Sequence, residues 1–108
     1  MAFKSKVTAN IGTSGSPSTI TATVGAGTTA TVIGLSLANT VSTNVTISAK
    51  LVKADASSAF LVKDATVLPG GAIVIVGGDQ KVVLEAGDSI TAYASAGTSV
   101  DAVISYLA

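Results

Sequence analysis

The stretch from Leu68 to Ile90 narrows most strongly what this chain can fold into. It holds two short apolar runs, Ala72 to Val76 and Val82 to Leu84, with glycine-rich turn signals before, between and after them. Apolar runs of this length bounded by Gly, Pro and Asp are typical of β-strands, whereas a helix needs ten or more residues without such breaks. The stretch therefore predicts closely spaced strands.

The rest of the chain repeats this strand pattern in a simpler form. Apolar and polar residues alternate with period two over Thr19 to Val24, Val45 to Leu51 and Val100 to Tyr106, and no segment keeps a period of 3.6 over ten residues. In Thr28 to Asn39 the alternation changes phase at Ile33-Gly34, which predicts a bulge. Turn signals recur about every 8 to 12 residues, so we expect an all-β, single-domain antiparallel β-sandwich, jelly-roll-like or Ig-like, of roughly seven to nine strands.

Several local features follow from the same pattern. We expect one domain over residues 1–108, with residues 1–17 forming an extended N-terminal arm or an edge strand. The segment Ala54 to Ser58 is predicted to be a loop, and Phe60 a core residue. We expect the two apolar runs of the opening stretch to form a hairpin, and Ser89 to Ser95 to form another with the C-terminal strand.

Composition points to an assembly and against charged partners. Of 108 residues, 48% are hydrophobic and 11% are charged, against about 25% charged in an ordinary soluble domain. Such a chain has little polar surface, so we expect part of its apolar surface to be hidden against other subunits. Six lysines balance six acidic residues and there is no arginine, which disfavours nucleic acid as a partner. No apolar run approaches the roughly 20 residues of a membrane helix, so no membrane partner is expected.

The residues for catalysis are few. Histidine and cysteine are absent, which removes the usual proton shuttles, thiol nucleophiles and zinc ligands. No Gly-Lys-Ser/Thr follows the glycine pairs, so these are turn glycines and not phosphate loops. We predict no enzyme, no catalytic, metal or cofactor-binding residue, and no small-molecule substrate. The scattered acids are interpreted as solvated turn carboxylates: Asp55, Asp64, Asp79, Glu85, Asp88 and Asp101.

The five apolar residues Ala72 to Val76 are the main candidate for a subunit interface. Side chains of a strand point alternately to opposite faces, so Ile73 and Ile75 share one face and Val74 and Val76 the other. One pair can enter the core, and the other then needs cover from a neighbour. The predicted interface residues are Ile73, Val74, Ile75, Val76, Asp79, Gln80, Lys81 and Tyr106. Within this set Asp79-Gln80-Lys81 is expected at a hairpin tip, as a contact point or a solvated turn, and Tyr106 in the core or the interface.

Four segments resemble those of small virion structural proteins of tailed phages. They are Leu61 to Ala65, Leu68 to Gly71, Val76 to Lys81 and Val83 to Ile90, within a similarity that spans about Ile33 to Leu107. The part Leu-x-x-Gly-Asp-x-Ile within the last segment also recurs as a turn in unrelated β-sandwiches.

The resemblance implies a non-catalytic, oligomeric β-sandwich subunit of the virion, assembled in the host cytoplasm. The closest functional expectation is a capsid cement or decoration protein that binds the major capsid protein and stabilises the head shell, as a trimer on local threefold axes. A tail, neck, baseplate or fibre-attachment module is the alternative. A receptor- or glycan-binding sandwich module is a further one, although four aromatic side chains make a poor stacking surface.

Overall fold

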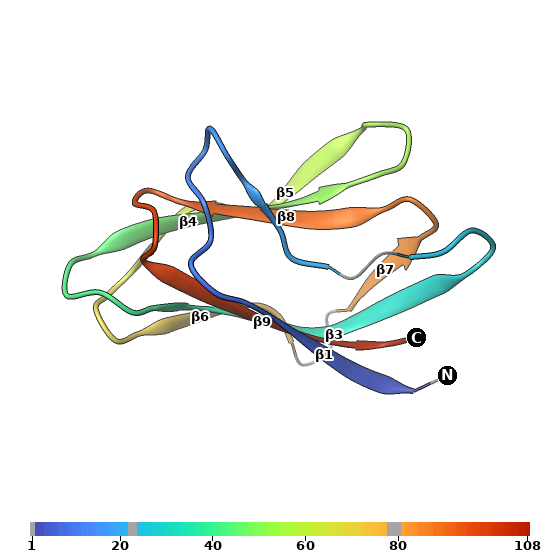
Figure 1. The fold of residues 1–108 in the computed structure, drawn as a ribbon, viewed down its shortest axis with the longest axis horizontal. Coiled ribbons are helices and arrows are strands. Elements are labelled where there is room, and N and C mark those ends of the chain that lie inside the picture. The colour runs from blue at the N-terminus through green and yellow to red at the C-terminus, as the bar shows by residue number, and fades with distance from the viewer. Residues whose placement is uncertain (1, 22–23, 78–80) are drawn as a thin grey trace.

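The computed structural model describes residues 2–21, 24–77 and 81–108, and these form two antiparallel β-sheets packed face to face (Figure 1). The described residues contain no helix, and so none that could span a membrane. The strands are β1 (Phe3–Thr8), β2 (Ser18–Thr19), β3 (Thr29–Asn39), β4 (Val45–Val52), β5 (Ser58–Val67), β6 (Ala72–Val76), β7 (Val82–Glu85), β8 (Ser89–Ala94) and β9 (Val100–Leu107). The predicted all-β sandwich is confirmed.

We call the two layers sheet A and sheet B. Sheet A has the order β1-β9-β3-β6, with β7 also paired to β3, and sheet B has the order β2-β8-β4-β5. The first strand, β1, is an edge strand of sheet A and not a free arm. Main-chain hydrogen bonds between Ala2 and Ala108, at 2.7 and 3.0 Å, extend its pairing with β9, so the two termini lie side by side (Figure 1).

Two predicted hairpins are wrong. Strands β8 and β9 lie in different sheets, so the connection between them crosses from one layer to the other. Strands β6 and β7 do not pair with each other. Both run antiparallel to β3, with Val76 opposite Leu35 and Val82 opposite Val32, so they follow one another along a single edge of β3. A glycine-rich turn signal does not show whether the next strand pairs with the previous one, enters the other sheet or pairs with the same neighbour. Here β6 and β7 both pair with the same edge of β3.

The alternation predicted for β6 is also wrong, because β6 contains a bulge. Leu35 pairs with Val76 and Ser36 with Val74, which leaves Ile75 as an extra residue on β6. Val76 is therefore buried with Leu35, while Val74 points outward and is 68% exposed. Ile73 and Ile75 are half-buried against the core. The bulge predicted at Ile33-Gly34 in β3 is confirmed by the register shift there.

The core lies between the sheets and is built almost wholly from Ile, Leu, Val and Ala. Of the described residues in the predicted strand at Thr19 to Val24, only Thr19 belongs to a strand, β2, which pairs with β8, and Ala22 and Thr23 lie outside the described residues. Ile20 nevertheless enters the core. The predicted loop at Ala54 to Ser58 lies between β4 and β5, with Ser58 already in β5. Phe60 is not a core residue: it is 41% exposed on the outer side of sheet B.

Candidate functional site

The outer side of sheet A carries an aligned row of exposed apolar side chains. Val7 lies opposite Val103, Val103 opposite Ser36, and Ser36 opposite Val74, so the row crosses four strands at one level. Residues directly opposite one another share a face of the sheet. Val7 is 66% and Val103 44% exposed, so the row is open to solvent.

A second apolar row runs parallel to the first. It joins Phe3, Leu107, Thr31 and Val83 across β1, β9, β3 and β7, and Phe3 is the most exposed large apolar residue described. Between the two rows the side chains are small. We call this surface the apolar face, made up of Phe3, Val7, Val74, Val83, Val103 and Leu107 with Ser5, Thr31, Gly34, Ser36 and Ser105 between them.

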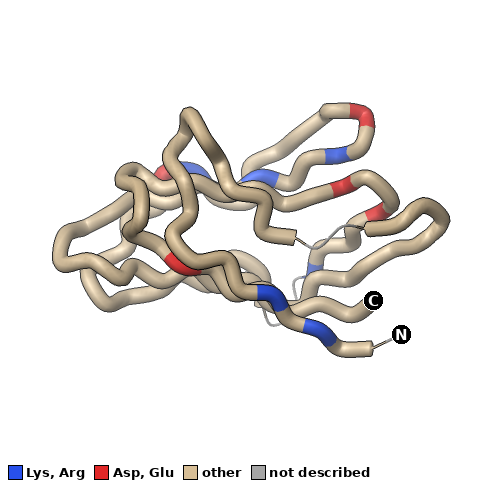
Figure 2. The backbone as a smooth tube through the Cα atoms, viewed as in Figure 1, with Lys and Arg blue, Asp and Glu red and all other residues tan. Residues whose placement is uncertain are grey.

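Charged residues lie around the apolar face but not within it. Strands β3 and β6 contain no charged residue, and the charge on β9 is Asp101 near its start. At the opposite end Glu85 closes β7. Figure 2 shows the middle of sheet A, strands β3 and β6, without charge, and the charged residues of the other sheet A strands are Lys4 and Lys6 on β1, Asp101 on β9 and Glu85 on β7. Electrostatic attraction therefore contributes little at this face, and a partner would be held mainly by burial of apolar area.

The outer side of sheet B is polar at the equivalent level. Thr19, Thr91, Lys50 and Phe60 lie opposite one another across its four strands. The Nζ atoms of Lys50 and Lys63 lie 5.1 and 5.2 Å from the centroid of the Phe60 ring. These cation–π contacts favour the ring at its exposed position outside the core. Sheet B thus presents the solvated side of the sandwich.

The two longest free strand edges are protected against pairing with another chain. On β1, Lys4 and Lys6 lie opposite Tyr106 and Ile104, on the side of sheet A that faces sheet B. Lys6 Nζ donates a hydrogen bond to the Thr21 carbonyl at 3.2 Å. An inward-pointing lysine on an edge strand opposes the approach of a further strand.

On β5 the protection is geometric. Its pairing with β4 is interrupted twice, and Asp64 adopts a left-handed conformation with φ of 52°. Ser48 Oγ accepts a hydrogen bond from the Asp64 main-chain N–H at 2.9 Å, which fixes the irregularity. A bulged edge twists away from a flat neighbour, so association by faces is favoured over association by edges.

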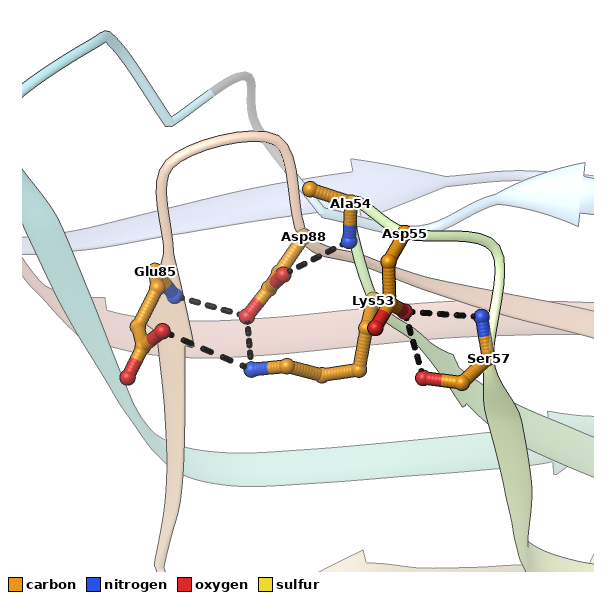
Figure 3. Close-up of polar contacts among 6 residues, drawn as sticks. All are labelled: Lys53, Ala54, Asp55, Ser57, Glu85 and Asp88. Atoms are coloured by element: carbon orange, nitrogen blue, oxygen red, sulfur yellow. Dashed lines mark hydrogen bonds and ion pairs between the residues drawn. The ribbon is translucent and has the colours of Figure 1, made fainter.

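A polar cluster joins the β4–β5 turn to the β7–β8 turn (Figure 3). Asp88 is 5% exposed, and its carboxylate accepts hydrogen bonds from Lys53 Nζ at 2.5 Å, from Glu85 N at 2.9 Å and from Ala54 N at 3.0 Å. The second carboxylate near Lys53 Nζ, that of Glu85, is 3.9 Å away and largely exposed. We call Lys53, Ala54, Glu85 and Asp88 the turn latch. Asp88 is therefore not the solvated turn carboxylate predicted from the sequence.

The charges of the turn latch support one another. The hydrogen bond from Lys53 is the largest cause of a lowered pKa for Asp88, aided by the Glu85 and Ala54 N–H groups against the effect of desolvation. Conversely, the hydrogen bond to Asp88 raises the pKa of Lys53 above 10.5. Both groups stay ionised near neutrality and are hydrogen-bonded to each other. The turn latch therefore stabilises the contact between the two turns and does not exchange a proton near neutral pH.

Gly87 brings the two turns together, and we expect Gly87→Ala to destabilise the fold by about 1–3 kcal/mol. Its φ is +85°, and an added Cβ would lie 2.8 Å from the Ala54 Cβ. Gly70→Ala is the matched control, because Gly70 also has positive φ, +73°, but has open space around it. Urea denaturation should show the larger loss for Gly87→Ala, and equal losses would show that the close approach of the turns is unimportant.

One cavity of about 380 Å³ opens between the layers beside the chain termini. Val32, Leu84 and Ile104 form part of its wall, with Lys4 and Tyr106 among the other lining residues. No Asp or Glu is among the described residues that line it, so it offers no carboxylate for acid–base chemistry. Within residues 2–21, 24–77 and 81–108, no group of three or more His, Cys, Asp or Glu could hold a metal ion.

The structure separates the residues predicted to form an interface. Val74 lies on the apolar face, whereas Ile73, Ile75 and Val76 contribute to the core side. Tyr106 is half-buried and lines the cavity. Lys81 is exposed immediately before β7, and Asp79 and Gln80 lie outside the described residues.

Sequence reasoning missed most of the apolar face. Phe3, Val7 and Val103 alternate with other residues in their own strands, so each strand alone reads as ordinary. The signal available was that both alternating sets of β9 include valine or leucine, which leaves no fully polar side. Comparison with family models, curated proteins and solved structures gives no match to this chain.

Proposed function

We propose that the chain is a non-enzymatic bacteriophage virion structural protein, of the capsid cement or decoration type. It binds the head shell through the apolar face and presents the polar side of sheet B to solvent. The phage assignment derives from the resemblance of residues 33–107 to small virion proteins, and the mode of action derives from the surface of the sandwich.

The observation that supports this function is the contrast between the two outer sides. One side has Val, Phe and Leu in two aligned rows, interrupted by Ser36 and Thr31 and without an interior charge. The other side has Thr, Lys and the lysine-flanked Phe60 across its four strands. A monomer that works alone in water has no use for such a contrast, because an exposed apolar patch of this kind favours association. A subunit that lies on a larger body does need one adhesive side and one solvated side.

The binding free energy expected for one copy suits a cement protein. Burial of one Val or Phe side chain contributes about 1.5–3 kcal/mol, and a few such contacts must first offset the loss of free motion on binding. A single copy then adds a modest net binding energy. Many copies on one shell add up, and their binding to the intact shell stabilises it by mass action.

Binding to particles tests this function directly. Purified protein is added to heads of the parent phage that lack it, and bound protein is measured by co-sedimentation. We expect saturable binding to the wild type, a loss of at least about tenfold in affinity for Val103→Asp, and little change for Thr91→Asp on the polar side. Equal binding of both variants would contradict a role for the apolar face.

Gold labelling of intact virions distinguishes head from tail. A cement protein gives label over the whole head surface. Label at one vertex or along the tail would overturn the head assignment in favour of the neck, baseplate or fibre-attachment alternative. Absence of the protein from purified virions would overturn the virion assignment altogether.

A further inference from the structure

We infer that, away from the particle, the apolar face packs against the apolar face of a second copy in a two-fold dimer. This rests on the proposed function only in taking the same face as the binding surface. The dimer would be the form in which the chain stays soluble before assembly, and it must open for the face to reach the shell.

A second copy is favoured first by charge. When a face packs against a copy of itself, charges of the same sign come close together, and a charged patch then loses binding free energy through repulsion. The interior of this face carries no charge, and the acids Glu85 and Asp101 lie toward opposite ends of sheet A. Self-packing therefore meets no repulsion at its centre.

The symmetry of one patch favours a pair over the trimer expected from the resemblance. A two-fold contact uses the same patch on both subunits, whereas a closed ring of three needs two different, complementary patches on each subunit. The described surface offers one aligned apolar patch, and the free edges of β1 and β5 are protected by lysine and by bulges. A two-fold arrangement is the one that this surface satisfies.

The relief of the face also suits a copy of itself. The middle row, Ser5, Ser105 and Gly34, has small side chains, and the rows on either side have larger ones except at Ser36 and Thr31 on β3. A Cβ at Gly34 would have no atom closer than 3.9 Å. From these side-chain sizes we expect the larger side chains of one copy to pack over the small middle row of the other, as in aligned packing of two sheets.

The area sets the strength of the pair. Four strands about 4.8 Å apart, with six to eight residues at about 3.3 Å each, give a face of roughly 400–500 Å². Two such faces bury about 800–1,000 Å² in total, at the lower limit for a specific interface. We therefore expect a reversible dimer that depends on concentration, which is what a storage form that later releases its face requires.

Sedimentation equilibrium over a concentration series tests the inference. The wild type should move from the 10.4 kDa monomer toward twice that mass as concentration rises. The double variant Val7→Lys/Val74→Lys should raise the dimer dissociation constant by at least about 100-fold, because each dimer loses four buried valines. The matched control Thr19→Lys/Thr66→Lys, on sheet B, should leave the constant within about threefold of wild type.

Both double variants change exposed side chains, and circular dichroism with thermal melting confirms that they remain folded. A wild-type monomer up to millimolar concentration, a trimer, or equal loss of association in both variants would each overturn the inference. The proposed function fails separately: a dimer of a protein that never binds heads refutes the cement role alone, whereas head binding by a strict monomer refutes the dimer alone.

Discussion

Val76→Asp is expected to unfold the domain, whereas Val74→Asp, two residues earlier on the same strand, is expected to leave it folded. Val76 is 1% exposed and lies opposite Leu35 in the core. An aspartate there loses the packing of valine and places a carboxyl group among apolar side chains, at a cost of about 4 kcal/mol or more. A small domain has a total stability of roughly 5–15 kcal/mol, so this loss removes most of it.

Val74 tolerates the same change because its side chain points away from the core and remains in water. Its partner on the neighbouring strand is Ser36, a small polar residue. A carboxylate at position 74 therefore has room and displaces no apolar side chain that covers it. Circular dichroism and urea denaturation should show a native β spectrum for Val74→Asp and a disordered one for Val76→Asp at 25 °C. Unfolding of Val74→Asp, or a native midpoint for Val76→Asp, would show that the register of the β6 bulge is wrong.

The alternating segments were predictable because one buried face imposes period two on the sequence. Val45–Val52 is such a strand, and its core residues Val45, Ile47 and Ala49 follow the period. The bulge of β3 was predictable for the same reason, since a change of phase at Gly34 is visible only against a regular alternation. The class of fold follows from these segments alone.

The phase of β6 could not be read in this way. Five consecutive apolar residues contain no polar marker, so an extra residue in the bulge leaves no trace in the sequence. Only the partner strand β3 fixes which of them point inward. The apolar face was hidden for a related reason, because its members come from β1, β3, β6, β7 and β9 and gather only after the strands pair.

The burial of Asp88 also could not be predicted from the sequence. Its position after Ala86-Gly87 indicates a turn, and the Asp88 N–H does donate to the Glu85 carbonyl at 3.0 Å. Its burial depends on Lys53 and Ala54, which lie 35 and 34 residues earlier, respectively. Nothing local to either turn shows that the two meet, so the sequence alone predicts a solvated turn.

Asp88→Asn is expected to lower the midpoint of thermal unfolding by roughly 5–10 °C at pH 7. The amide keeps the size of the side chain but removes its charge and replaces one acceptor oxygen with a donor. Oδ2 of Asp88 accepts hydrogen bonds from Lys53 Nζ and from the Glu85 main-chain N–H. If the amide nitrogen takes the place of Oδ2, both of these donors lose their acceptor. Glu85→Gln is the control, because its carboxylate is exposed and 3.9 Å from Lys53, and it should shift the midpoint by about 1 °C or less.

The pH dependence identifies the charge pair as the cause. Because the folded pKa of Asp88 is lowered below 3.8, its contribution is present above that value and is lost as pH falls through the folded pKa. Because the folded pKa of Lys53 is raised above 10.5, its contribution is present below that value and is lost as pH rises through the folded pKa. Wild type should therefore lose stability at both extremes.

Asp88→Asn should reduce both limbs of this profile, because the asparagine carries no charge and the largest cause of the raised pKa of Lys53 is removed. A small acid limb should remain, because the pKa of Asp55 is lowered without Asp88, mainly by hydrogen bonds from the Ser57 side chain and main chain. Thermal melts from pH 2 to pH 11 on wild type, Asp88→Asn and Lys53→Met, with the double variant to complete the cycle, measure the coupling. Parallel wild-type and Asp88→Asn profiles would mean that the latch acts by turn geometry alone, because the hydrogen bond between Lys53 and Asp88 is the largest cause of both pKa shifts.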